Sequence, residues 1–329
     1  MEGIAFKVMP IEVTKKCNLR CKFCYACGSQ YPNYKDMSDK EICSFLERFG
    51  DHGGENVLLT GGEALLRRDL CSIILYAKSL GLKIGLFTNA TLMSQQFADF
   101  AADNIDSITV SLDGPQHIHN WLRGDDESFQ RAIRGLEMLR NANVHLNIQS
   151  MIVPQNICDT DWLIQLAQRF KPSTIKLSHV SRIGRGKQRK DLWLNQNQMD
   201  HIKGLAGVIS KKCDNFRTCV LTNIITAQEL RAFYPDFECS DFNNELLPWM
   251  LPDGTVLTCY VDRFQSYWKL STDKDYPIPM RGALERREKL LSVVKERTRN
   301  LDSFDFMELI SSLAEEIARK DTGANEASK

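Results

Sequence analysis

Four cysteines stand within eleven residues near the start of the chain, in the stretch CNLRCKFCYAC at positions 17–27. Cys17, Cys21 and Cys24 have the spacing C-x3-C-x2-C, which differs from the paired C-x2-C spacing of tetrahedral zinc sites. Three thiolates in a tight loop can hold three corners of a cubane iron–sulfur cluster, whose open fourth iron can bind a small molecule and pass it one electron. Zinc binding and chance clustering are the alternatives. We interpret the fourth thiol, Cys27, as a small neighbouring side chain.

The composition is that of a soluble globular protein. The chain has 329 residues, of which 43% are hydrophobic, and its 42 basic residues balance its 42 acidic ones. This balance gives no electrostatic footprint for general binding to nucleic acids or anionic membranes. No apolar run reaches the ~18 residues of a membrane helix, and the first residues lack the pattern of a signal peptide. We therefore expect a cytoplasmic protein, in which eleven cysteines are better explained by metal binding or catalysis than by disulfides.

Short apolar segments alternate with helix-like segments over the first 180 residues. The expected strands show little polar alternation, as in strands covered on both faces. They span residues 6–14, 56–60, 82–88, 107–112, 145–153 and 174–180. The expected helices span residues 39–49, 70–81, 94–104, 127–143 and 160–170. Six βα units predict a parallel sheet with right-handed crossovers, and six are fewer than the eight of a closed barrel. The fold class is therefore α/β, a partial (β/α)6 TIM-like barrel.

Local signals support two of these helices. Ser38 is a suitable N-cap for the helix at 39–49, and Glu41 completes a capping box. The helix at 70–81 ends on a glycine suited to a C-cap. Cys43, Cys71 and Cys158 fall in helix-like stretches, where we expect them to be buried.

The cysteine loop follows the first expected strand, and loops at the carboxyl ends of parallel strands build active sites. With that placement, KKCNLRCKFCY (15–25) resembles the signature of the radical S-adenosylmethionine (SAM) superfamily. In that family SAM chelates the open iron of a 4Fe–4S cluster. Reductive cleavage of SAM then yields a 5′-deoxyadenosyl radical, which abstracts a substrate hydrogen. The resemblance implies that Cys17, Cys21 and Cys24 are the catalytic cluster ligands and that Phe23 lies near the adenine.

Further motifs of the family follow at successive strand ends. LLTGGEALL (58–66) resembles the "GGEP" motif with Ala64 in place of proline, FTNATL (87–92) resembles "TNGT", SLDGP (111–115) resembles the fourth-strand motif, and HIHNWLRGDDESF (117–129) resembles "HDRxRG…SF". The resemblance implies that Glu63 accepts a hydrogen bond from the methionine amino group and that Arg123 pairs with the methionine carboxylate. The implied cofactor-binding residues are Phe23, Tyr25, Gly61, Gly62, Glu63, Asn89, Ser111, Asp113 and Arg123.

A second group of cysteines follows the predicted barrel. Cys239 and Cys259 stand in a C-x14-G-x4-C pattern, with Gly254 in a PDG turn between two short strands. This pattern resembles the start of the SPASM or twitch extension, in which such a hairpin holds a second 4Fe–4S cluster. One auxiliary cluster is one interpretation if Cys213 and Cys219 join the pair. Buried structural thiols and a hydrogen-atom donor to a substrate radical are the other two.

The predicted organisation has three parts: a barrel core over residues 1–190, a small α+β SPASM/twitch-like domain with a helical end over 191–320, and a disordered tail over 321–329. Within the second part we expect helices at 198–213, 280–299 and 303–320. The basic run SRIGRGKQRK (181–190) is interpreted as a solvated loop, and because it follows a strand end at the active-site rim, binding of an acidic stretch of substrate is the alternative.

The resemblance implies a radical SAM enzyme of oxidoreductase or peptide-maturase type. Its expected substrate is a ribosomally made peptide or protein, and its expected electron donor is a protein such as flavodoxin or ferredoxin. A small-molecule or cofactor precursor is the alternative substrate. A non-catalytic iron–sulfur or zinc sensor is the distant alternative.

Overall fold

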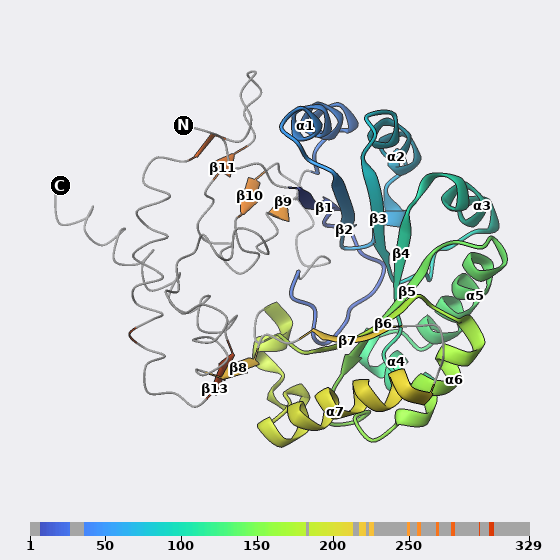
Figure 1. The fold of residues 1–329 in the computed structure, drawn as a ribbon, viewed down its shortest axis with the longest axis vertical. Coiled ribbons are helices and arrows are strands. Elements are labelled where there is room, and N and C mark those ends of the chain that lie inside the picture. Colours follow the sequence, from blue (N-terminus) through green and yellow to red (C-terminus); the bar gives the residue numbers. More distant parts are fainter. Residues whose placement is uncertain are drawn as a thin grey trace.

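A computed structural model describes residues 7–26, 36–181 and 184–212, together with short strands between residues 217 and 305. Six parallel strands, paired in chain order, form the centre of the fold. They are β1 (Val8–Thr14), β2 (Asn56–Gly61), β3 (Lys83–Thr88), β4 (Ser107–Ser111), β5 (Leu146–Ile152) and β6 (Thr174–His179). Each lies within two residues of a strand expected from the sequence, so the open, partial α/β barrel is confirmed (Figure 1).

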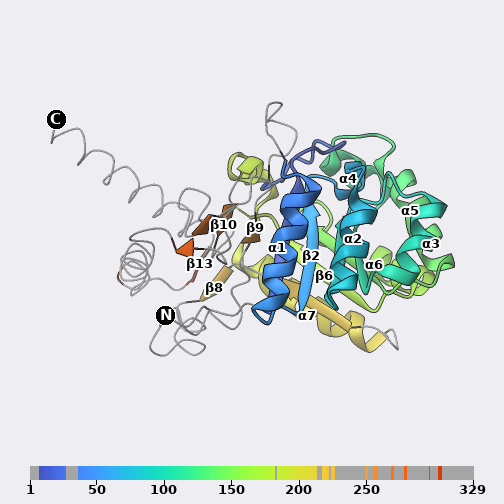
Figure 2. The same cartoon turned by 90° about the horizontal axis from the view of Figure 1, so that it is seen from above.

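The strands are connected by helices, and all of these except the short helix after β4 cover the outer face of the sheet (Figure 1). They are α1 (Asp39–Asp51), α2 (Leu70–Ser79), α3 (Gln95–Asn104), α4 (Gln116–Arg123), α5 (Ser128–Asn141), α6 (Thr160–Phe170) and α7 (Gln196–Lys212). Short 3-10 helices are η2 (Ala64–Leu66), η3 (Gly184–Gln188) and η4 (Lys190–Leu192). Neighbouring helices such as α1 and α2 run side by side along this face (Figure 2). Of the described helices, none is long and apolar enough to cross a membrane.

The capping signals are present as expected. The Ser38 hydroxyl accepts a hydrogen bond from the Glu41 amide, and the Glu41 carboxylate accepts one from the Ser38 amide. Helix α2 ends near Gly81, whose φ of +77° lies in the left-handed region that favours glycine. The expectation of buried helical cysteines is wrong: Cys43 and Cys71 are partly exposed, and Cys158 is exposed in the turn before α6.

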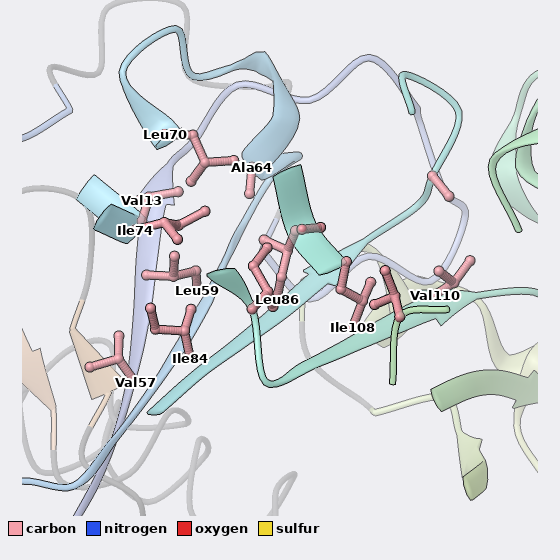
Figure 3. Close-up of a cluster of buried hydrophobic side chains, with 14 of the residues drawn as sticks. Val13, Val57, Leu59, Ala64, Leu70, Ile74, Ile84, Leu86, Ile108 and Val110 are labelled. Atoms are coloured by element: carbon pink, nitrogen blue, oxygen red, sulfur yellow. The ribbon is translucent and has the colours of Figure 1, made fainter. Parts of the chain in front are cut away.

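The main core lies between the sheet and its helices. Alternate strand residues, including Val57, Leu59, Ile84 and Leu86, are almost fully buried against the helices (Figure 3). Because successive strand side chains point to opposite faces, the intervening positions face the barrel interior. Several of these interior positions are polar, among them Thr60, Ser111 and Gln149. The polar interior is where a ligand site can form.

The parallel sheet continues beyond the six expected strands. Helix α7 packs on α6, and β7 (Arg217–Leu221) then pairs in parallel with β6. The sheet therefore extends to Leu221, past the boundary at residue 190 that the sequence suggests. The cause is an apolar face of α7, which buries Met199, Ile202 and Ile209 against the α6 side of the core.

Short strands join the opposite edge of the sheet. The two strands expected around Gly254 are present as β9 (Trp249–Met250) and β10 (Thr255–Leu257), which pair antiparallel, and β9 pairs with β1. Strands β11 (Trp268–Lys269) and β12 (Ile278–Pro279) extend this edge. Strand β13 (Ser303–Asp305) pairs with β8 (Ile224–Thr226), so the helix expected from residue 303 does not begin there. The tail at 321–329 and most of the expected helix at 280–299 lie outside the described residues.

Candidate active site

Three thiols converge on one cavity at the carboxyl ends of the strands. The cavity is lined by the loop after β1 and by the ends of β2 to β5, as the sequence predicts for an active-site face. The predicted residues that line it are Cys17, Cys21, Phe23, Cys24, Tyr25, Gly61, Gly62, Asn89, Ser111 and Arg123. Five sequence motifs that are far apart along the chain are thus brought to one place.

The cysteine loop is held from outside by main-chain hydrogen bonds to the C-terminal end of α4. The Lys22 amide donates to the Leu122 carbonyl at 2.8 Å, and the Arg20 amide donates to the Arg123 carbonyl at 3.2 Å. Gly124 has a φ of +69°, and a β-carbon on it would lie 2.9 Å from the Arg20 carbonyl oxygen. Helix α4 and the loop therefore form one supporting unit, which the sequence analysis did not anticipate.

Arg185 in η3, the segment that follows β6, also supports the cysteine loop. Its Nε donates to the Cys21 carbonyl at 2.8 Å, and its amide donates to the Cys24 carbonyl at 3.0 Å. It also lines the cavity. The interpretation of the run at 181–190 as a solvated loop is therefore wrong for Arg185, although Lys187 and Lys190 are exposed.

The glycine pair after β2 packs directly against the start of the cysteine loop. A β-carbon on Gly62 would lie 2.1 Å from the Lys16 carbonyl oxygen, and one on Gly61 would lie 2.4 Å from the Thr14 carbonyl oxygen. The Gly62 amide donates to the Thr14 carbonyl at 2.8 Å. Only glycine permits this approach, which fixes the end of β2 beside Cys17.

Glu63 is buried behind the cavity and does not line it. Its Oε1 accepts hydrogen bonds from the Thr88 hydroxyl at 2.6 Å and the Leu65 amide at 3.1 Å, and its Oε2 accepts one from the Asn89 amide at 2.8 Å. Burial raises its pKa, and these three donors oppose that effect. The carboxylate thus fixes the β3 end that carries Asn89, and its contact with the methionine amino group stays a prediction.

Asp113 and Arg123 form a buried pair. Arg123 Nε lies 2.5 Å from Asp113 Oδ2, and Arg123 Nη2 lies 2.9 Å from Oδ1. Asp113 also accepts from the Met151 amide at 3.0 Å, and its side chain does not line the cavity. The expected contact between Asp113 and the cofactor is therefore not supported, because its oxygens are used within the protein. Arg123 reaches the cavity with Asp113 as its partner.

Arg123 of this pair also contacts a cysteine thiol and an aromatic ring. Arg123 Nη1 lies 3.7 Å from Cys21 Sγ, and its Cζ lies 5.1 Å from the Phe23 ring centroid. Burial disfavours the charge of Arg123, but Asp113 and Cys21 together raise its pKa above the usual range. A permanent positive charge is therefore held beside Cys21.

The donor set fits an iron–sulfur cluster. Burial raises the pKa of Cys17 to about 12 and also raises that of Cys21, so thiolates here require a neighbouring positive charge. Cationic iron can supply this charge, and Arg123 opposes the rise in the pKa of Cys21. Within the described part of the chain, no three His, Cys, Asp or Glu side chains are arranged to bind one single metal ion. A cubane binds each thiolate through a different iron, so its ligands do not share one centre.

Gln149 of β5 and Arg185 of η3 are among the cavity residues that the sequence did not predict. Gln149 is paired in register with Ser111, which places both on the interior face of the sheet. A polar residue within a strand expected to be covered on both faces is the one signal that points to Gln149. Cys27, Cys213, Cys239 and Cys259 lie outside the described residues.

Together, the open α/β barrel and its thiol-lined cavity define a class of iron–sulfur enzyme folds. Residues 11–167 match the model of the radical SAM superfamily. The part of the chain that carries the site thus belongs to the radical SAM superfamily.

Two curated relatives illustrate the range of similar proteins. The AdoMet-dependent heme synthase of Oleidesulfovibrio alaskensis is 32% identical over 155 residues, which are 46% of this chain and 40% of the relative. The sporulation killing factor maturation protein SkfB of Bacillus subtilis is 28% identical over 44% of this chain and 36% of the relative. The chain thus matches less than half of the length of each.

Among solved structures, Streptococcus suis SuiB bound to S-adenosylmethionine has a similar fold. The TM-score is 0.63 at 16% identity, over 88% of this chain and 66% of that one. At this identity the similarity concerns the fold alone.

Proposed function

We propose that this protein is an enzyme that cleaves SAM reductively and uses the product to remove a hydrogen atom from a substrate. The observation that carries the proposal is the convergence of Cys17, Cys21 and Cys24 on one cavity with the polar ends of the next strands. The three thiols would hold a 4Fe–4S cluster. When bound, the cluster and SAM would supply a 5′-deoxyadenosyl radical.

The chain's own residues prepare this site. The glycine pair presents the end of β2 without side chains, and the Asn89 amide group is held by the Asn18 side chain at 3.0 Å. Ser111, Gln149 and Arg123 line the wall that would face the polar groups of SAM. Phe23 and Phe87 give that wall aromatic surface and limit access of water.

Iron and sulfide analysis after anaerobic reconstitution tests the proposal. We expect the wild type to hold about four irons for each cluster and a Cys17/Cys21/Cys24→Ala variant to lose that set. Cys158→Ala is the matched control, because Cys158 is an exposed thiol in a turn. Formation of 5′-deoxyadenosine with dithionite should require the same three cysteines. Zinc in place of iron, or normal SAM cleavage by Cys21→Ala, would overturn the proposal.

For the substrate, we propose a ribosomally made peptide or protein. Support comes from SkfB, a maturation protein, and from the two strands β9 and β10 that stand where the hairpin of a SPASM-like extension is expected. An auxiliary cluster on Cys213, Cys219, Cys239 and Cys259 belongs to this interpretation, and would bring the iron content to about eight per chain.

A small-molecule substrate is the second candidate, because the heme synthase is the more similar of the two relatives. The two candidates can be separated with an extract divided by ultrafiltration. If the retained fraction increases 5′-deoxyadenosine formation and a peptide in it changes mass, the substrate is a peptide or protein. If only the filtrate has this effect, the substrate is a small molecule.

A further inference from the structure

The outer side of the cysteine loop carries a basic surface around an exposed tryptophan. Trp121 in α4 is 37% exposed, and the Lys22 Nζ and the Arg189 Cζ each lie 5.5 Å from the centroid of its ring. Two cations therefore contact the exposed ring. Arg20, Lys22, Trp121, Arg189 and Lys190 are called the Trp121 surface below.

This surface lies directly against the layer that holds a predicted cluster ligand. Lys22 follows Cys21 in the chain, and its amide is bonded to the carbonyl of Leu122. Leu122 packs with Cys21 in a buried apolar cluster, and Trp193 packs against that cluster. The Lys190 Nζ lies 6.0 Å from the centroid of the Trp193 ring. A protein seated on the Trp121 surface is therefore one apolar layer away from Cys21.

The charge of this surface is a local excess. The whole chain is balanced, with 42 basic and 42 acidic residues. Lys22 and Arg189 lie against Trp121, and Arg20 and Lys190 are exposed and close to them in the chain. Among the neighbouring acids, Asp191 is bonded to Arg189 at 2.6 Å and Asp125 is bonded to Arg131 at 2.6 Å. Such an excess attracts an acidic partner and increases its rate of association. Exposed tryptophan and arginine side chains are also the types most often found at the centre of protein interfaces.

We propose that the Trp121 surface is the docking site for an acidic protein that carries single electrons. The inference rests on the proposed function, which consumes one electron for each SAM cleaved. In the step, the carrier would be oxidised by one electron, and the cluster that Cys17, Cys21 and Cys24 would hold would be reduced by one. No covalent bond of the chain forms or breaks, and no proton is transferred.

Binding of an acidic flavodoxin to the full chain, measured by calorimetry without any turnover, is the first test. We expect Lys22→Glu and Lys190→Glu to weaken binding by roughly tenfold each at low salt, because each replaces an attraction with a repulsion. Wild-type binding should weaken as added salt shortens the Debye length. Lys40→Glu, a charge reversal on the exposed face of α1, should bind like the wild type. Equal binding by all four proteins would overturn the proposal.

The second measurement separates this inference from the proposed function. Dithionite is a small reductant that needs no protein surface, so SAM cleavage with dithionite should be unchanged in Lys190→Glu. Cleavage with reduced flavodoxin should fall with the binding constant. If Lys190→Glu loses dithionite-driven cleavage, its side chain acts on the catalytic cavity and the docking proposal is wrong. If even the wild type cleaves no SAM with dithionite, the proposed function fails while the binding result still tests the surface.

Discussion

Replacing Arg123 with alanine should destabilise the protein far more than replacing an arginine in an ordinary ion pair. Arg123 and Asp113 have side chains that are only 10% and 0% exposed. Removing one partner of a buried pair leaves an uncompensated buried charge, which typically costs about 3–5 kcal/mol. The loss of the ring contact with Phe23 acts in the same direction. We therefore expect the free energy of unfolding to fall by about 4 kcal/mol for Arg123→Ala.

The matched control is Arg131→Ala. Arg131 pairs with Asp125 at 2.6 Å, but these side chains are 29% and 27% exposed, so its loss should cost about 1 kcal/mol or less. The assay is urea unfolding followed by circular dichroism, with the slope checked for each variant. A double variant that also replaces Asp113 with leucine should recover part of the loss, because no buried charge remains. If Arg123→Ala lost no more than Arg131→Ala, the buried pair would not have the structural role argued for it.

Three further perturbations test other parts of the fold. Gly62→Ala should lower the free energy of unfolding by about 1–3 kcal/mol, because the added β-carbon would lie 2.1 Å from a carbonyl oxygen. Gly204→Ala in α7 is the control: its β-carbon meets nothing, so urea unfolding should show a gain of up to about 1 kcal/mol. Ser38→Ala should cost about 1 kcal/mol by loss of the N-cap, and thermal unfolding measures it. Burial lowers the pKa of His119 from 6.5 to about 4, so the unfolded chain binds more protons between these pH values. The contribution of neutral His119 to the free energy of unfolding is complete above pH 6.5 and falls by at most roughly 3 kcal/mol as the pH drops toward 4. Urea unfolding at a series of pH values should therefore show a weaker pH dependence for His119→Phe than for the wild type.

Elements with strong local signals were predicted well from the sequence. Each of the six strands is an apolar run bounded by turn residues. A parallel strand that is covered on both faces needs such a run, so its sequence is easy to recognise. The capping box of α1 is local chemistry that depends on residues three positions apart. The cysteine triad and the glycine pair were also found, because each needs particular residue types at fixed spacing.

The missed elements depend on tertiary contacts that have no local signal. Helix α4 begins after Pro115 with few apolar residues. It is held by Leu122, which is buried beside the cysteine loop, and by His119, whose Nδ1 accepts a hydrogen bond from the Asp113 amide. Arg185 was interpreted as part of a solvated charge run, yet it satisfies the Cys21 carbonyl across 164 residues of sequence. The hydrogen bonds of Glu63 within the protein were not anticipated either: a carboxylate this buried must be hydrogen-bonded, and the nearest donors belong to the protein.

The register of the last parallel strand changes how the second group of cysteines should be understood. Cys219 is paired in register with Lys176 of β6, and Lys176 is paired with Gln149, which lines the cavity. Cys219 therefore belongs to the barrel sheet at its β7 edge, whereas the β9–β10 pair joins the β1 edge. An auxiliary cluster that uses Cys219 together with the hairpin cysteines requires these two edges to meet. The strand pairing alone keeps the Cys219 backbone in the barrel sheet. Iron analysis of Cys219→Ser tests the auxiliary-cluster interpretation, because only the loss of a cluster ligand lowers the iron content.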